Sequence, residues 1–216
     1  MADASLKILV LFAHPRYESS VVNKELLESI EDLPFVTIHD LYEVYPDFDI
    51  DAKAEQNLLL EHDVIVWHHP FHWYSAPPLM KQWIDLVLEF GWAYGPGADK
   101  LAGKIFFNAL TAGGAYEVYQ HEGRNRFKIR EFLAPFDQTA VLCHGIYFPP
   151  FVVHAANTFT SGTMCHSFGN QYRKVLTQIS SGLLDQDEAE RRDYLNIWAY
   201  EPDQADAIAE RMEMHK

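Results

Sequence analysis

Residues 63–85 constrain the fold of this chain more than any other stretch of its sequence. The stretch opens with the apolar run 64–67, which is typical of a strand buried on both faces of a sheet. An aromatic turn follows at residues 70–74, and a helical pattern begins near Leu79. Open α/β sheets bind ligands just beyond the carboxyl ends of their strands, where this turn would lie. The turn is therefore predicted to carry a planar aromatic cofactor.

Four other apolar runs occur along the chain, and helical patterns separate them. The five predicted strands are residues 7–13, 35–40, 63–69, 104–110 and 146–154, the last with a break at Pro149-Pro150. Helices are expected from a cap at Ser19 or Ser20 to Pro34, from a cap at Asp51 through Leu59, over 79–90, over 128–143 with a kink near Pro135, and over 162–179. Residues 40–49 and 115–127 are expected to be loops. This alternation predicts a doubly wound α/β fold, with a five-stranded parallel sheet in the order 2-1-3-4-5 and helices on both faces.

Length and composition are those of one ordinary globular domain. With 216 residues, 48% of them apolar, the chain can bury one substantial core. We predict a folded domain over residues 1–183 and a charged, helical carboxyl-terminal extension over 184–216, with Tyr194, Ile197 and Trp198 as its apolar contacts. The formal net charge of −14 disfavours nucleic acid and anionic lipid surfaces as partners.

The cellular compartment follows from cysteine use and from the absence of targeting patterns. Cys143 and Cys165 do not make a disulfide framework in a chain of this length, which fits a reducing cytosol. The apolar run 6–13 is too short for a signal core and leads into His-Pro-Arg rather than a cleavage site. No run approaches the roughly 20 apolar residues that span a bilayer. We expect a cytoplasmic protein that can still dock on a membrane protein.

Three loops are predicted to meet at one edge of the sheet. In the predicted strand order, strands one and three flank the point where the order of the sheet reverses. The loops after strands one, three and four are residues 14–23, 70–75 and 111–119. Because the carboxyl ends of parallel strands share an edge, these three loops define one candidate site.

The first loop is a candidate phosphate site. It lacks both the G-x-G-x-x-G and the Walker patterns. It offers Ser19, Ser20 and Asn23 at a helix N-terminus beside Arg16, and backbone N–H groups there can hold a phosphate. An ordinary capped helix explains this loop equally well.

The aromatic turn is a candidate ring site. Plain core packing is the competing explanation, but strand ends are wet and five such residues in a row fit poorly in a purely structural turn. Trp73 can pack against the face of a flat ring while N–H groups of the turn reach its polar edge. The run Thr111-Ala112-Gly113-Gly114 complements the turn, because glycines let a flat ligand approach the backbone closely.

Metal and nucleophile chemistry are weakly supported. His68, His69 and His72 cluster in the sequence, but adjacent strand residues face opposite sides of a sheet, and no H-E-x-x-H spacing or cysteine pair accompanies them. Ser75 lacks the G-x-S-x-G elbow, and neither cysteine has a recognisable base in a known local signature. No metal site is predicted.

Several motifs are similar to those of one known family. They are Ala13-His14-Pro15, Leu41-Tyr42, YPDFDI at 45–50, Ala54-Glu55-Gln56, His69-Pro70, Trp73-Tyr74, Lys81-Gln82-Trp83-Ile84-Asp85, Gly91-Trp92-Ala93-Tyr94 and LAGK at 101–104. Together they resemble the flavodoxin-like NAD(P)H:quinone oxidoreductase family, and within it the ancillary proteins of glutathione-regulated potassium-efflux systems. The similarity covers residues 7–174, and the segment after Leu183 has no recognised counterpart.

The resemblance implies a flavodoxin-like fold and a flavin held non-covalently at a homodimer interface. FMN and FAD both stay open, and the short architecture favours FMN. By position, the ribityl-phosphate side would be bound by His14, Ser20, Val21, Val22 and Asn23. The isoalloxazine ring would be lined by Phe71, His72, Trp73, Tyr74, Thr111, Ala112, Gly113 and Gly114. Tyr119 would stand over the flavin near the point of hydride transfer, as the catalytic residue.

The implied activity is a hydride shuttle. A nicotinamide nucleotide, NADH or NADPH, would reduce the flavin, and a quinone would then accept both electrons in the same cavity. The sequence departs from the family at two places: Asn125 falls where the animal enzymes carry a histidine partner for the tyrosine, and Ala112 replaces a threonine.

These departures motivate a second hypothesis. The protein would be mainly a regulatory subunit of a potassium/proton antiporter, held by that partner at the inner face of the cell membrane. Flavin would then be a sensing or structural ligand. A flavodoxin-type electron carrier is disfavoured, because flavodoxins have phosphate loops richer in Thr, Ser and Gly.

Overall fold

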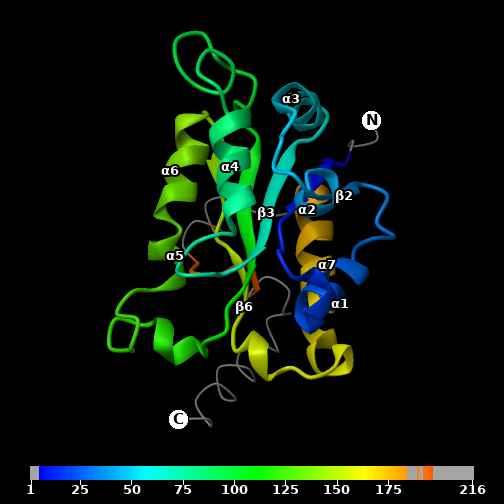
Figure 1. Cartoon of the computed structure of the whole chain (residues 1–216), viewed down its shortest axis with the longest axis vertical. Helices are drawn as coiled ribbons and strands as arrows, with labels where there is room; N and C mark the ends of the chain where they lie inside the picture. Colours follow the sequence, from blue (N-terminus) through cyan, green and yellow to red (C-terminus); the bar gives the residue numbers. More distant parts are fainter. Residues whose placement is uncertain (1–4, 184–188, 190–191, 197–216) are drawn as a thin grey trace.

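A parallel β-sheet organises the molecule (Figure 1). The computed structural model describes residues 5–183, 189 and 192–196. The strands are β1 (Ile8–Phe12), β2 (Val36–Asp40), β3 (Val64–Pro70), β4 (Ile105–Thr111), β5 (Ile146–Tyr147) and β6 (Phe151–Val153). Their order is β2-β1-β3-β4-β5, and β6 also pairs with β4. The predicted order 2-1-3-4-5 and the α/β class are confirmed.

The central strands are buried on both faces, as their apolar runs predict. Every residue of β1 and β3 is buried, whereas β2, at the edge, is mostly half-buried. The register sets Phe12 beside His68 and Pro70 beside Thr111, so the ends of β1, β3 and β4 reach the same edge. The three loops predicted to meet therefore start from adjacent points.

Helices cover both faces of the sheet and divide the core in two (Figure 1). One face carries α3 (Ala52–Leu60), α4 (Pro78–Val87) and α6 (Ala134–Leu142), with Leu59, Trp83 and Phe136 among the residues they bury. The other face carries α1 (Val21–Glu28) and α7 (Gly162–Ser180), which pack against each other. Because alternate residues of each strand face opposite helical layers, both faces of the sheet are dry.

Prolines break two elements where the sequence places them. The last predicted strand is split by Pro149-Pro150 into β5 and β6, so the sheet has six strand segments rather than five continuous strands. The predicted helix over 128–143 is likewise two helices, α5 (Ile129–Phe132) and α6, with Pro135 in the first turn of α6. Proline lacks the N–H that a continuous ladder or helix needs at these positions.

Three expectations about local structure are corrected. Residues 40–49 are not all loop: α2 (Leu41–Val44) forms there because the carboxylate of Asp40 accepts N–H bonds from Tyr42 and Glu43. The loop expected over 115–127 contains a 3-10 turn, η2 (Tyr116–Tyr119). The helix expected to reach Phe90 ends at Val87, and Phe90 is exposed. Single turns escape prediction because they bury too few residues to show a period.

A described part of the carboxyl-terminal extension packs on the domain. Tyr194 and Leu195 are buried, and the side chain of Asn196 pairs with both backbone groups of Val152 in β6. Lys128 forms an ion pair with Asp193 at 2.9 Å. Ile197 and Trp198, also predicted as apolar contacts, lie outside the described residues.

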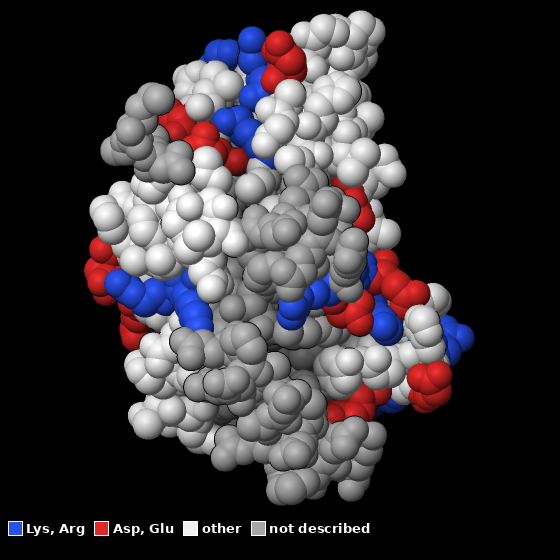
Figure 2. Space-filling view, turned by 180° about the vertical axis from the view of Figure 1, so that it is seen from behind, with Lys and Arg blue, Asp and Glu red and all other residues white. Residues whose placement is uncertain are grey.

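Surface charge is mixed on the face opposite to the view of Figure 1. Figure 2 shows Lys and Arg there in small groups next to Asp and Glu, among the residues that the structure describes. In the described residues, no helix combines the length and apolar character that crossing a membrane requires.

Candidate functional site

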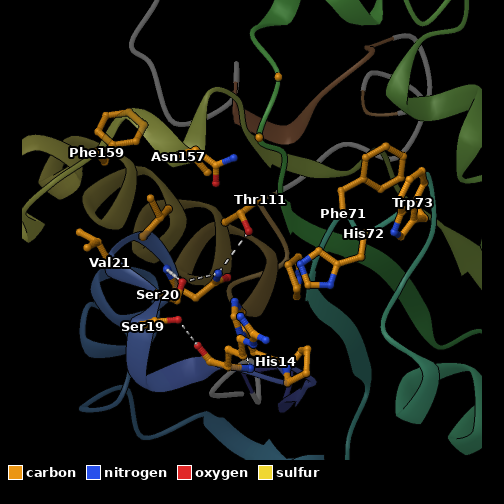
Figure 3. A pocket seen from close by; sticks show the side chains of 18 of the residues that line it. His14, Ser19, Ser20, Val21, Phe71, His72, Trp73, Thr111, Asn157 and Phe159 are labelled. Atoms are coloured by element: carbon orange, nitrogen blue, oxygen red, sulfur yellow. Dashed lines mark hydrogen bonds between the residues drawn. The ribbon is translucent and has the colours of Figure 1, made fainter.

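A cavity of about 1020 Å³ opens at the carboxyl edge of the sheet. It lies where β1, β3, β4 and β6 end, and its volume is at the top of the range of about 300–1,000 Å³ for single small-molecule sites. Figure 3 shows Ser19, Ser20 and Val21 on one side of it and Phe71, His72 and Trp73 on the other. The lining residues are His14, Pro15, Arg16, Ser19, Ser20, Val21, Val22, Asn23, Pro70, Phe71, His72, Trp73, Tyr74, Thr111, Gly113, Gly114, Tyr119, Arg124, Asn125, Ala156, Asn157 and Phe159.

The cavity brings together the three loops that the sequence selects. All the predicted site residues line it except Ala112, which is fully buried behind it. The N–H of Ala112 donates to the Val153 carbonyl, and its own carbonyl accepts from Ala156. Ala112 therefore shapes the wall through β6, and its N–H is already donated to Val153 rather than to the cavity. Whether the lining residues act as predicted stays a prediction.

A fourth loop, residues 154–159 after β6, also contributes to the cavity. Ala156, Asn157 and Phe159 line it, and sequence reasoning missed them. The signal was available, because the last parallel strand ends at the same edge as the others. The break at Pro149-Pro150 made the end of that strand hard to place.

His68 anchors one side of the cavity from beneath. Its Nε2 lies 3.1 Å from Asn23 Oδ1, and Tyr172 donates to its Nδ1 at 3.4 Å. Asn23 in turn donates to Ser20 at 2.8 Å and to Thr111 at 3.2 Å (Figure 3). Burial lowers the pKa of His68 to about 3, so the ring is neutral at pH 7. A buried chain of polar groups therefore fixes the start of α1 against the end of β4.

His69 anchors the other side through the opposite face of the sheet. Tyr147 donates to Asn108 Oδ1 at 2.5 Å, and the amide nitrogen of Asn108 lies 3.0 Å from His69 Nε2. Nδ1 of His69 is therefore the protonated nitrogen, and it donates to the Pro70 carbonyl at 3.0 Å. Burial lowers the pKa of His69 to about 4. The two adjacent histidines thus hold two different loops, and neither is placed to share a metal with the other.

The α1 end of the cavity suits an anionic group. Val21 and Val22 occupy the first two positions of α1, whose N–H groups have no acceptor within the helix. The Ser20 side chain caps the helix by accepting from Asn23 N–H. His14 accepts from Arg16 N–H through Nδ1, which leaves Nε2 as the donor of the neutral ring. Burial, with a smaller contribution from His72, lowers the pKa of His14 to about 4.

The aromatic turn is strained and projects into solvent. Trp73 and Tyr74 both have positive φ, 50° and 65°, and Ser75 N–H closes the turn on the His72 carbonyl at 3.0 Å. Two adjacent residues of this conformation normally call for Asn-Gly, and a bulky side chain there costs about 1–3 kcal/mol. Trp73 is nevertheless 92% exposed. Such strain without burial points to a functional reason for the tryptophan.

Two glycines on the β4 side leave room for neighbouring side chains. A Cβ on Gly113 would lie 2.6 Å from Asn157 Nδ2, and one on Gly114 would lie 2.7 Å from Val118 and 3.0 Å from the Tyr119 ring. Tyr119 is buried, and burial raises the pKa of its phenol. Gly114 therefore lets Tyr119 pack against the wall of the cavity.

The cavity differs in charge from the rest of the protein. The chain has 31 Asp and Glu residues, yet none is among the described residues that line it. Its only charged lining residues in the described part of the chain are Arg16 and Arg124. Within the same residues, no group of His, Cys, Asp and Glu is arranged to hold a metal ion. The site therefore favours an anionic organic ligand.

The fold and the cavity together define a flavodoxin-like protein. The chain belongs to the family described as Flavodoxin-like fold, which residues 6–176 match. It is 46% identical over 174 residues to the uncharacterized NAD(P)H oxidoreductase YdeQ of Bacillus subtilis (strain 168), covering 81% of this chain and 88% of that one. It is also 45% identical to the glutathione-regulated potassium-efflux system ancillary protein KefG of Enterobacter sp. (strain 638), covering 69% of this chain and 82% of KefG.

Solved structures share the fold at similar coverage. General stress protein 14 of Treponema denticola, in complex with FMN, has a TM-score of 0.76 and 35% identity, covering 80% of this chain and 99% of that one. A protein of P. pentosaceus described as an NADPH-quinone reductase has a TM-score of 0.71 and 28% identity, covering 81% and 98%.

Proposed function

We propose that this protein is a flavin-dependent NAD(P)H:quinone oxidoreductase. The observation that carries the proposal is the cavity itself. It has a helix N-terminus at one end and an aromatic turn at the other, and no described carboxylate lines it. That combination suits a ligand with a phosphate and a flat ring. The oxidoreductase and FMN-binding relatives support the same choice.

The lining residues fit a flavin. The N–H groups of Val21 and Val22, together with Ser20 and Arg16, would hold the phosphate. Trp73 and the other residues of the turn would pack on the ring, and Gly113 and Gly114 admit it close to the backbone. The FMN complex of the Treponema relative favours FMN over FAD. Bound flavin would supply the two-electron redox chemistry, which no side chain here can provide.

The chain's own residues would orient the substrates and keep the site dry. Tyr119 is a phenol and is protonated at neutral pH, and burial raises its pKa further, so it can donate a hydrogen bond to a substrate oxygen. His14 is neutral at the same pH and offers an Nε2–H donor. Both groups therefore supply hydrogen-bond donors without adding charge to the ring site.

A homodimer is part of the proposal. Trp73 is 92% exposed at the mouth of the cavity and Phe90 is 70% exposed after α4. A second copy that packed on Trp73 would cover its exposed ring and close the ring end of the site. We place the protein in the cytoplasm.

A second candidate function is regulation of a membrane antiporter. The KefG relatives are named as ancillary proteins of a potassium-efflux system. Asn125 supports this candidate, because it stands where the animal enzymes carry a histidine partner for the tyrosine. Its amide oxygen accepts a weak hydrogen bond from Tyr74 at 3.5 Å. In that case the protein would act at the inner face of the membrane through its partner.

The test uses the purified full-length chain. We expect a flavin absorption spectrum, release of FMN on denaturation, and reduction of a soluble naphthoquinone by NADH or NADPH. Asn23→Ala should weaken flavin retention, because Asn23 joins Ser20 to Thr111. The matched Asn170→Ala, on the exposed side of α7, should not. A flavin-loaded protein that reduces no quinone would eliminate the enzyme proposal. Transporter activation that survives loss of turnover would favour the second candidate.

A further inference from the structure

The two arginines of the cavity come from different loops. Arg16 belongs to the loop before α1, where the cofactor phosphate is proposed to bind. Arg124 and Asn125 belong to the segment after η2, and Tyr119, the last residue of η2, also lines the cavity. Arg124 lies close enough to Tyr119 to oppose the increase of its pKa that burial causes. A cation therefore stands on the Tyr119 side as well, where the flavin phosphate is not expected.

The segment that carries Arg124 is tightly built. Gly123 N–H donates to the Gln120 carbonyl at 2.9 Å, and Asn125 N–H donates to the Val118 carbonyl at 3.0 Å. A Cβ on Gly123 would lie 2.3 Å from the Glu117 carbonyl oxygen, so only glycine allows this close return onto η2. Asn125 also links the segment to Tyr74 of the aromatic turn. The backbone of Arg124 is thus fixed beside the cavity.

The side chain of Arg124 has no acidic partner in the described part of the chain. Two nearby side chains have other partners: His121 Nε2 lies 2.9 Å from Glu131 Oε2, and Lys128 forms an ion pair with Asp193. Arg126 is exposed and also lacks a described carboxylate partner, but it does not line the cavity. Both arginines have fixed backbones, because Arg126 N–H donates to the Gly123 carbonyl at 3.0 Å, but only Arg124 also has access to the cavity.

We propose that Arg124 binds a phosphate group of the nicotinamide nucleotide that serves as electron donor. The inference rests on the proposed function. The donor carries several negative charges and must approach a protein of net charge −14, so a local cation is needed to hold it. Arg is well suited because its planar fork pairs with two phosphate oxygens. Arg124 lines the same cavity in which the flavin is proposed to bind, so a donor that reaches the flavin can contact it.

The phosphate can be either of two groups on the donor. The pyrophosphate is common to NADH and NADPH, whereas the 2′-phosphate is found in NADPH alone. An arginine would recognise both groups in the same way. The two are separated by comparing the effect of an Arg124 substitution on NADH and on NADPH. A loss confined to NADPH assigns the 2′-phosphate, and an equal loss for both nucleotides assigns the pyrophosphate.

The experiment compares Arg124→Gln with Arg126→Gln in the flavin-loaded, full-length protein. Both variants remove one positive charge from the same segment, and only the first removes it from the cavity wall. We expect Arg124→Gln to raise KM for the recognised nucleotide about tenfold or more, which is the scale of a lost charge-assisted hydrogen bond, with kcat at saturation little changed. Arg126→Gln should leave KM within about twofold of the native protein.

A binding measurement separates this inference from the proposed function. Calorimetry with ADP and with adenosine 2′,5′-bisphosphate detects the phosphate contact without any turnover. Weaker binding of at least one of these ligands in Arg124→Gln, with native affinity in Arg126→Gln, supports the inference. This result would stand even if the protein does not reduce quinones. Unchanged binding of both ligands in Arg124→Gln, or equal weakening in the two variants, overturns it. Gly123→Ala should reproduce the loss with the arginine still present, because it displaces the segment.

Discussion

The cluster around Glu55 and the turn around Trp73 both combine polar and aromatic groups, but the first is buried and fully hydrogen-bonded and the second is exposed and strained. Glu55, on α3, is 2% exposed and accepts three hydrogen bonds: from His39 at 2.8 Å, Tyr45 at 2.6 Å and Trp83 at 2.7 Å. Burial raises the pKa of its carboxyl, but these three donors outweigh burial and hold the pKa below its usual range. Every strong donor there has a partner, so the cluster is closed.

The Trp73 turn leaves its groups open. Its backbone is strained at two adjacent residues and its tryptophan is almost fully exposed. Tyr74 stacks on Phe132 in the described chain, but the Trp73 side chain, 92% exposed, buries almost no surface to offset the strain of its backbone. The difference teaches where to look for function: closed clusters stabilise the fold, and open, strained ones are available to a ligand.

Several of the motifs that this chain shares with its family contribute to the buried Glu55 cluster rather than to the cavity. Tyr45, Glu55 and Trp83 belong to three of the motifs that indicate the family, and all three meet in the closed cluster. Gln56 and Gln82, from the same motifs, bond to the Val87 and Phe48 carbonyls. These motifs therefore identify the scaffold, and membership in the family says less about the chemistry of the open edge.

The largest effect on stability is expected from Glu55→Ala. Three buried donors would lose their acceptor, which should cost about 3–5 kcal/mol of the free energy of unfolding. Urea denaturation followed by circular dichroism measures the loss. The folded fraction should still bind flavin with native affinity, because the cluster does not line the cavity.

The control for Glu55 is an exposed carboxylate. Glu31→Ala removes the same chemical group from the surface and should change stability by less than about 0.5 kcal/mol. Similar losses in the two variants would mean that the Glu55 cluster contributes no special stability, and the contrast drawn here between closed and open regions would fail.

The histidines beneath the cavity should make the protein sensitive to acid. Burial lowers the pKa of His68 from 6.5 to about 3 and that of His69 to about 4. Below pH 6.5 these two histidines bind protons in the unfolded chain but remain neutral in the folded chain. Their stabilising contribution is therefore complete above that pH and is lost as the pH falls toward 4. Each should contribute a slope of about 1.4 kcal/mol per pH unit.

Unfolding curves measured from pH 7 to pH 4.5 test this slope. His68→Gln keeps an amide donor for Asn23 but cannot titrate, so its stability should fall less steeply with acid. The comparison uses slopes because the substitution also lowers stability at every pH. Parallel pH dependences for the variant and the native protein would contradict the assignment.

The fold was predictable in detail because burial leaves a strong mark on sequence. Apolar runs located β1, β3 and β4, and the prolines at 135 and 149–150 located the breaks. Short elements such as α2 and η2 were missed, since each depends on one cap or one backbone return rather than on a periodic apolar face. The loops of the site were found through topology, which decides which strand ends share an edge.

Individual roles within the site were less predictable. The sequence could not separate Ala112, which is buried behind the wall, from Gly113 and Gly114, which face the cavity. It gave no indication that His68 and His69 would anchor two different loops through hydrogen bonds on opposite faces. These features depend on contacts between distant segments, and a local pattern carries no record of them.

Gly113→Ala should disturb the site more than the fold. The added Cβ would displace the exposed Asn157 side chain, 2.6 Å away, which can move at little cost. We expect a loss of stability below about 1 kcal/mol, which is ordinary for a surface change, and a clear loss of flavin affinity measured by fluorescence titration. Native affinity in this variant would show that the 113–114 wall does not approach the ring.

Trp73→Asn should give the smallest change in stability and the sharpest test of the comparison. Asparagine tolerates positive φ, and Trp73 has little buried surface to lose. Relief of strain should therefore leave the protein as stable as the native form or more stable by about 1 kcal/mol. Flavin affinity should fall about tenfold, because the stacked ring is gone. Trp73→Phe keeps both the ring and the strain, and should retain most of the affinity. If Trp73→Asn instead unfolds the protein at lower urea, the turn belongs with the closed cluster, and its exposed ring has no need of a ligand.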